Sequence, residues 1–334
     1  MTPGQRRIPL LLFACLLTLQ HAFTQEVRMD QSSMEHPGDT VHKSTTSLTS
    51  LQHASGPRLW LVAGSHVVLW TGSFIALNKA WYDGYEKTSF HFFNDNAEWQ
   101  QMDKAGHTWT AYQVSRLSTE MWHWTGLKRQ KSAWLGGISA IAYQSIIEIQ
   151  DGYSAEWGFS WGDMAANVAG AAAYVSQELG WKEQRIQIKL GYSPYDYPTP
   201  ELKTRRNQLF GKPFYERMLK DYNSQTYWVS ANIRAFLPDS RLPKWLNIAA
   251  GYNARGMLGG EDNNWTTKDG GSYSYPQIDR TRHFFLAPDL DLTRIRTNKK
   301  WLRSLLFVAN MIKIPAPALE LSSKGQFKAH ILYW

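Results

Sequence analysis

Residues 103–116 read DKAGHTWTAYQVSR and residues 144–170 read QSIIEIQDGYSAEWGFSWGDMAANVAG, and polar residues recur at helical spacing in both stretches. Residues four apart share one face of a helix. We therefore predict that three pairs of side chains face a common interior of a helical bundle. The pairs are Asp103 with His107, Gln144 with Glu148, and Asp163 with Asn167.

Four helices are predicted around these stretches, at about residues 60–81, 98–124, 133–150 and 161–180. The first has no formally charged side chain between Arg58 and Lys79. It is long enough to span a bilayer, although a helix buried in protein explains it equally well. Ser160 is the predicted cap of the fourth helix, with Asp163 three residues later as in a capping box. The many alanines and glycines after Asp163 predict a narrow helix that a neighbour can approach closely.

After Gly180 the sequence changes to alternating apolar and polar residues, which is typical of half-buried strands. Pro288 suggests that its strand is an edge strand or carries a bulge. The predicted strands are too few for a complete barrel, and an open sheet edge cannot face lipid. We therefore expect a sheet or partial barrel packed against the helices. Strands are predicted at residues 185–192, 227–236, 245–255, 283–292 and 326–334, a helix at 301–311, and irregular structure at 203–222.

The predicted fold class is α+β, with a four-helix core followed by an antiparallel β-rich region. The expected organisation along the chain is a signal peptide at residues 1–24, a disordered arm at 25–56, a helical domain at 57–182 and the β-rich region at 183–334. The arm is assigned to disorder because it is rich in Ser, Thr, His, Asp and Gln and poor in apolar residues.

The first residues have the layout of a secretory signal peptide. Arg6 and Arg7 precede an apolar run, and Ala22-Phe-Thr24 provides small residues two positions apart for cleavage. Cys15 is the chain's one cysteine, and the bulky Phe13 before it makes lipid attachment there unfavourable. We expect cleavage near residue 24 and location in the periplasm or outer membrane of a Gram-negative-type envelope. A mature chain without cysteine has no disulfides and no thiolate metal site.

Composition points to the kind of partner. Of the 334 residues, 14% are aromatic, including 16 Trp and 16 Tyr. Such a content suits contact with lipid, sugar or a membrane interface, and an aromatic-rich core is the alternative. The net charge of +8 comes from scattered basic residues with no nucleic-acid motif. We therefore expect a membrane or an envelope lipid or glycan as the partner, and no nucleic acid.

The same stretches resemble a known family. Asp103-Lys104-Ala-Gly-His107, Glu148 and the segment Gly158–Gly170, with Phe90–Asp95 before them, resemble the YfiM-like family of uncharacterised bacterial proteins described as periplasmic lipoproteins. More distantly, the order acid-Lys-x-x-His, Glu and Asp-x-x-x-Asn-x-x-Gly is similar to the VanZ-like helical membrane proteins. The resemblance covers about residues 60–180 and implies a helical envelope protein. It identifies neither a reaction nor a cofactor, so the cofactor stays unknown, and the chain departs from the lipoprotein description at Cys15.

Three interpretations of the polar residues remain open. Carboxylates beside an imidazole suit a divalent metal, or general acid–base chemistry on a phosphoryl, ester or glycosyl substrate. A mutually hydrogen-bonded network would instead specify how the helices pack. A groove that contacts the headgroup of a lipid or glycan is the third interpretation. The candidate catalytic residues are Asp103, His107, Glu148, Asp163 and Asn167.

No zinc signature and no familiar nucleophile motif assigns a metal or a cofactor to this set. The sequence therefore predicts an exported cell-envelope protein without an established reaction. A metal-assisted or acid–base hydrolase acting on an envelope lipid or glycan is the enzymatic alternative.

Overall fold

The structure is a computed structural model, and it describes residues 54–79, 86–267 and 270–334. The predicted signal peptide, Cys15 and residues 25–53 of the predicted arm lie outside the described residues. The last residue of that predicted arm, Gly56, begins the first described helix.

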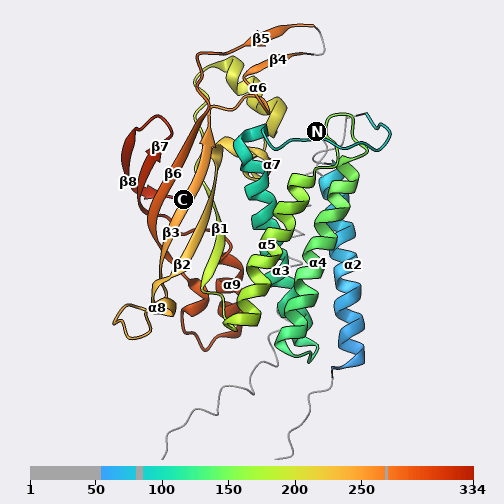
Figure 1. Ribbon diagram of the computed structural model, residues 1–334, viewed down its shortest axis with the longest axis vertical. Helices are drawn as coiled ribbons and strands as arrows, with labels where there is room; N and C mark the ends of the chain where they lie inside the picture. The colour runs from blue at the N-terminus through green and yellow to red at the C-terminus, as the bar shows by residue number, and fades with distance from the viewer. Residues whose placement is uncertain (1–53, 80–85, 268–269) are drawn as a thin grey trace, which may run out of the picture.

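Four long helices stand side by side against one side of a curved sheet (Figure 1). The helix α3 is central, since it packs against α2, α4, α5 and the strands β1 and β2. A short 3₁₀ turn, η4 (Glu98–Gln101), leads into it. The helices are α2 (Gly56–Leu77), α3 (Met102–Trp124), α4 (Arg129–Asp151) and α5 (Trp161–Gly180).

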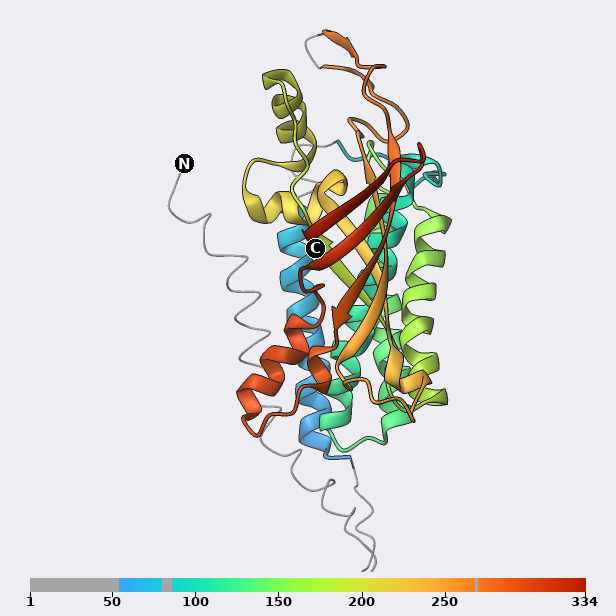
Figure 2. The same cartoon turned by 90° about the vertical axis from the view of Figure 1, so that its left-hand side faces the viewer.

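The sheet is antiparallel throughout, in the order β1-β2-β3-β6-β7-β8, and it is not closed (Figure 2). The predicted α+β class, a helical core followed by an antiparallel β-rich region, is therefore confirmed. The strands are β1 (Ile186–Tyr192), β2 (Gln225–Asn232), β3 (Leu246–Arg255), β6 (Thr281–Leu290), β7 (Ala316–Ser322) and β8 (Phe327–Tyr333). A separate two-stranded sheet joins β4 (Asn264–Thr266) to β5 (Ser272–Ser274).

The connections hold shorter helices. The prediction of irregular structure at residues 203–222 is wrong, because α6 (Pro200–Phe210) and α7 (Phe214–Lys220) lie there. In α6, only Leu202 and Phe210 are buried, so the sequence carries little apolar periodicity. The remaining connecting elements are η5 (Tyr222–Ser224), α8 (Ile233–Phe236), η6 (Leu292–Arg294) and α9 (Lys300–Ala309).

Pro288 was predicted to mark an edge strand or a bulge. The edge-strand alternative is wrong. Its strand, β6, lies between β3 and β7. Pairing with β7 runs only from His283 to Leu286, so no hydrogen bond to that strand is required of Pro288. A proline, which lacks an N–H, is tolerated at such a position.

The helices pack closely where their residues are small. A Cβ atom added to Gly170 of α5 would lie 2.2 Å from the backbone oxygen of Thr108 on α3. The predicted narrow helix is therefore confirmed, as is its cap, because the side chain of Ser160 accepts a hydrogen bond from the Asp163 amide. At the start of α3, Trp99, Gln100 and Gln101 all have φ between 47° and 63°, the left-handed region that non-glycine residues rarely adopt.

The two faces of the sheet differ in an unusual way. The concave face is buried, and it combines an apolar cluster around Trp228 and Phe285 with buried polar groups. Lys189 and Asp289 form a 2.7 Å ion pair there with both side chains fully buried. The convex face exposes the alternate residues, and apart from Arg282 near the start of β6 the large ones are mostly apolar. The apolar ones include Val229, Ile248, Phe284, Leu286, Leu319 and Leu321.

Candidate functional site

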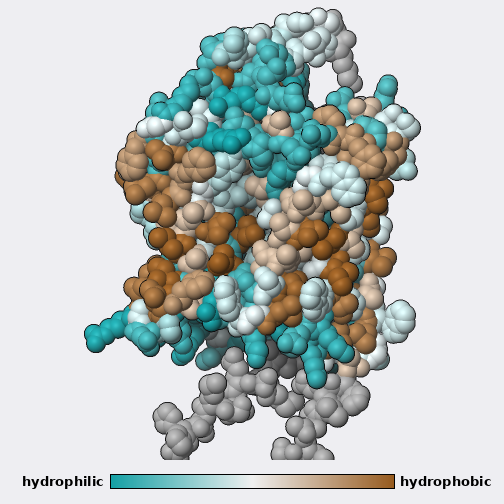
Figure 3. All heavy atoms as spheres, in the orientation of Figure 1, coloured by the Kyte–Doolittle hydropathy of each residue, from teal (hydrophilic) through white to brown (hydrophobic). Residues whose placement is uncertain are grey.

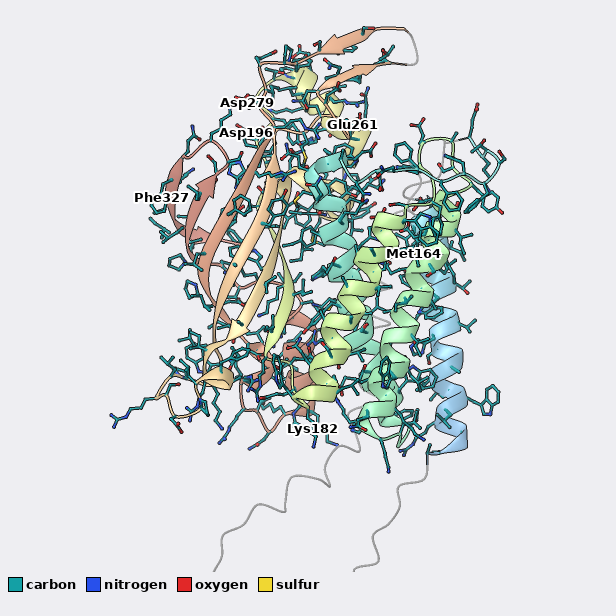
Figure 4. All side chains as sticks on the ribbon, in the orientation of Figure 1. Met164, Lys182, Asp196, Glu261, Asp279 and Phe327 are labelled. Carbon is teal, nitrogen blue, oxygen red and sulfur yellow. The ribbon has the colours of Figure 1, made fainter. Side chains whose placement is uncertain are left out.

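The three predicted pairs meet inside the helical bundle, near the end where α3 and α5 begin. Figure 4 marks this height by Met164, the residue after Asp163. His107 lies at the centre of the group. Its Nδ1 is 3.0 Å from Asn167 Oδ1 and 3.4 Å from Glu148 Oε1. Its Nε2 is 3.8 Å from Asp163 Oδ1 and 3.9 Å from Asp103 Oδ2.

Gln144, the predicted partner of Glu148, also belongs to this group. Its Nε2 donates to Asn167 Oδ1 at 2.8 Å, the same oxygen that faces His107. The predicted geometry, in which the three pairs face a common interior, is therefore confirmed. All five candidate residues from the sequence lie together, and whether they are catalytic stays a prediction.

Lys104 is a site residue that the sequence interpretation missed as such. Its Nζ lies 2.7 Å from Asp163 Oδ1, 2.7 Å from Asp95 Oδ1 and 3.4 Å from Asp103 Oδ2. Asp95 also accepts a 2.6 Å hydrogen bond from the hydroxyl of Ser160. The sequence shows that Lys104 follows Asp103. It gives no indication of the contacts with Asp95 and Asp163.

The β-rich half contributes one more group. The hydroxyl of Tyr222 in η5 donates to Asp103 Oδ1 at 2.6 Å. Burial raises the pKa of Tyr222, and the neighbouring Asp103 raises it further, so the phenol keeps its proton and remains a donor. Since 119 residues separate these partners, no local sequence pattern predicts the contact.

Parts of the cluster are deeply buried and incompletely hydrogen-bonded. Glu148 is 1% exposed and Asn167 is fully buried. Among the described residues, Glu148 Oε1 and Asn167 Nδ2 have no hydrogen-bond partner. Such atoms are uncommon in folded proteins because an unmet hydrogen bond is unfavourable. The hydrogen bonding inside the cluster is therefore incomplete.

The cluster contains more acidic than basic side chains, and burial raises the pKa of Glu148 to about 8 and that of Asp163 to about 9. The carboxyl groups of Asp95, Asp103, Glu148 and Asp163 face one lysine, Lys104, and one imidazole, His107. For Asp95, burial raises the pKa, but interactions with Asp163, Lys104 and Ser160 outweigh it and the net pKa is lowered. A cluster with excess carboxyl groups binds protons or cations readily.

A cavity of about 380 Å³ opens onto the cluster between the bundle, β1, β2 and α7. Its polar end is formed by Asp103, His107 and Asp163, and Tyr222 and Tyr227 lie on the sheet side. The rest of the lining is mostly apolar, with Asp95, Glu98, Asp151 and Gln225 among further polar residues. The apolar residues include Leu77, Trp109, Ile147, Leu190, Met218 and Leu219. A cavity with apolar walls and a few convergent polar groups is the usual form of a small-molecule site.

A divalent metal is one cation to consider. Asp103, His107 and Asp163 each offer a ligand atom, and these atoms lie within 4.8 Å of one another. Carboxylate oxygens and an imidazole nitrogen are suitable ligands. However, the ammonium of Lys104 already contacts both carboxylates. A metal ion would have to bind beside that positive charge or displace it.

Comparison with known proteins gives one family match, which covers the candidate site and identifies no reaction. No curated protein and no solved structure matches the chain. A family model matches a segment that contains η4, α3, α4 and most of α5. This segment includes all five candidate residues and Lys104. Residues 91–177 of the chain match the family described as predicted periplasmic lipoprotein (DUF2279).

Proposed function

We propose that this is an exported envelope protein that performs acid–base chemistry on the polar group of an envelope lipid or glycan. The observation that carries the proposal is the placement of His107. Its ring lies between Glu148 on one side and Asp103 and Asp163 on the other, in the lining of a mostly apolar cavity. The periplasmic description of the matching family supports the envelope location.

The chemistry proposed is hydrolysis of an ester or phosphoester bond. His107 Nε2 removes a proton from a water molecule as its oxygen bonds to the carbon or phosphorus centre. The bond to the leaving oxygen breaks, and the proton returns from Nε2 to that oxygen. The ammonium of Lys104, beside Asp163, stabilises the negative charge that develops on the substrate.

The roles of the other candidates follow from their contacts. Asn167 orients the imidazole through Nδ1, and Gln144 fixes the amide of Asn167. Tyr222 holds Asp103 from the sheet side. These are positioning residues, since they act through His107 or Asp103.

The test is a search for reaction products. Purified protein is incubated with phospholipid, lipopolysaccharide and peptidoglycan fractions, and products are measured by mass spectrometry. Hydrolysis products should appear with the native chain and with His123→Ala, an exposed histidine on the same helix. They should disappear with His107→Ala. Identical product profiles for native and His107→Ala protein across all fractions would rule out this acid–base role.

A divalent-metal site is a second candidate, favoured by the grouping of Asp103, His107 and Asp163. Metal analysis of the purified protein and titration with Mn²⁺ and Zn²⁺ test it. Retention of the metal by His107→Ala, or no binding by the native chain, would exclude these residues as ligands.

A further inference from the structure

The convex face of the sheet has the polarity that a water-exposed sheet avoids. Along β6 and β7, the buried concave positions include His283, Asp289 and Glu320, while the exposed convex positions include Phe284 and Leu319. In a sheet with one solvated face, polar residues point outward. Strands with an apolar outer face and a polar inner face are typical of sheets that contact lipid.

The helices continue this apolar surface. On α2 the exposed large side chains run from Trp60 to Ile75, and on α4 from Trp134 to Ile149. At 1.5 Å per residue, each run is about 22 Å long, close to the roughly 25 Å apolar band of outer-membrane proteins. We name this surface the apolar belt. It comprises Trp60, Leu61, Val67, Val68 and Ile75 of α2, Trp134, Ile138, Ile146 and Ile149 of α4, and Val229, Ile248, Phe284, Leu286, Leu319 and Leu321 of the sheet.

The belt lies between two polar ends. In Figure 3, brown residues cross the middle of the molecule over both the sheet and the helices, with teal residues above and below. The helix α2 is long and apolar enough to cross a membrane, and most of it is not covered by the rest of the described chain.

One end carries the charge that anionic headgroups require. The loops at the end where Lys182 lies (Figure 4) expose nine basic side chains, and Asp239 is the one exposed acid among them. Trp181, Trp245 and Trp301 are exposed at the same end. Tryptophans and cations gather at membrane–water interfaces. The basic residues are Lys128, Lys131, Lys182, Arg241, Lys244, Arg296, Lys299, Lys300 and Arg303.

The sheet edge beside the helices is sealed by protein. The side chain of Gln177 on α5 accepts from the Ile186 amide at 2.8 Å and donates to the Ile186 carbonyl at 2.9 Å. Gln113 on α3 donates to the carbonyl of Ile188 at 2.7 Å. The backbone of Met311 and Lys313 pairs with Leu190. The expectation that an open edge cannot face lipid is met here, because α3, α5 and a C-terminal segment supply the missing partners.

From the polarity of the sheet, the length of the belt and the basic end, we infer that the protein is embedded in a lipid bilayer. The acyl chains surround α2, α4 and the convex face of the sheet, and anionic headgroups contact the basic end. The outer edge of β8 pairs with no described strand.

The test uses introduced cysteines, because Cys15 is the chain's only cysteine and the native chain serves as the blank. Val68→Cys on α2 and Leu319→Cys on β7 are labelled with a fluorescent dye, and so is Glu261→Cys, an exposed residue at the polar end opposite Lys182 (Figure 4). The protein is reconstituted in phosphatidylethanolamine–phosphatidylglycerol vesicles. Nitroxide lipids, labelled in the acyl chain, should quench the first two dyes and spare the third, and aqueous iodide should do the reverse.

Three results would overturn the inference. Quenching of the belt dyes by iodide would show that the belt faces water. Protection from both quenchers would show that a second copy or another protein covers it. Third, brominated lipids that fail to quench the tryptophans of the native, unsubstituted chain would exclude embedding even if a cysteine variant folds poorly.

Discussion

The ammonium of Lys104 lies 2.7 Å from Asp163 Oδ1, and this contact joins the first turns of α3 and α5. The same ammonium also contacts the carboxylates of Asp95 and Asp103, so Lys104 pairs with three acidic side chains. The bundle and the candidate site therefore depend on the same side chain.

Replacing Lys104 by methionine should destabilise the protein by about 3 kcal/mol, because removal of one partner leaves partly buried charges unpaired. Chemical unfolding followed by tryptophan fluorescence measures the change. Lys203→Met, at an exposed position of α6, is the matched control and should change stability by less than about 0.5 kcal/mol. Equal effects of the two substitutions would contradict the central role of Lys104.

The same substitution should increase affinity for divalent cations. Without the ammonium, Asp103, His107 and Asp163 keep their grouping while the positive charge that competes with a metal is gone. Calorimetric titration with Mn²⁺ is expected to show tighter binding to Lys104→Met than to the native chain. If this binding persists in a variant that also carries His107→Ala, the metal binds elsewhere.

His107 should carry its proton on Nδ1 when the ring is neutral. Gln144 donates to Asn167 Oδ1, which identifies that atom as the oxygen and makes it an acceptor for Nδ1–H. Nitrogen NMR shifts of labelled histidine at high pH distinguish the two tautomers. An Nε2–H form would mean that the Asn167 amide is oriented the other way.

Asp95 should contribute stability that depends on pH. Its pKa is lowered in the folded protein, so its contribution is fully present above the unfolded pKa of about 3.9. The contribution is lost as the pH falls through the lower folded value. The stability difference between the native chain and Asp95→Asn should be largest at neutral pH and shrink below about pH 4. The exposed Asp196→Asn is the control, and a constant difference across this range would contradict the prediction.

The contribution of side-chain hydrogen bonds at the edge of β1 to stability can be tested by a matched pair of substitutions. Gln113→Met removes the donor to the carbonyl of Ile188 and should destabilise the protein by about 1–3 kcal/mol, since a partly buried acceptor loses its partner. Gln208→Met, on the exposed side of α6, should be nearly neutral. Unfolding curves recorded in the same detergent or buffer compare them. Equal curves would show that water or lipid headgroups satisfy the edge.

The bundle could be predicted from sequence because its signals are local. Pairs four residues apart identified the inward faces of α3, α4 and α5, and Ser160 identified the start of α5. These patterns placed Asp103, His107, Glu148, Asp163 and Asn167 in one interior. The boundaries moved little, since capping and helical periodicity act within a few residues.

Other features depend on contacts between distant residues. The alternation along β2 predicted which residues share a face, but not that the polar face would be the buried one. That polarity follows from groups such as Asp289, which pairs with Lys189 of another strand. The helix α6 was missed because its surroundings bury few of its side chains, and β7 was missed because Pro317 interrupts its pattern.

The hydrogen bonds made to the edge of β1 also affect the order in which the chain assembles. Gln113 and Gln177 precede the strand, but Met311 and Lys313 follow it by more than a hundred residues. Synthesis therefore produces the helices first and the last edge partners more than a hundred residues after β1. Until then the Leu190 N–H and carbonyl need water or a chaperone. A chain that stops before Met311 would remain a substrate for quality-control proteases, however well its helical bundle had formed.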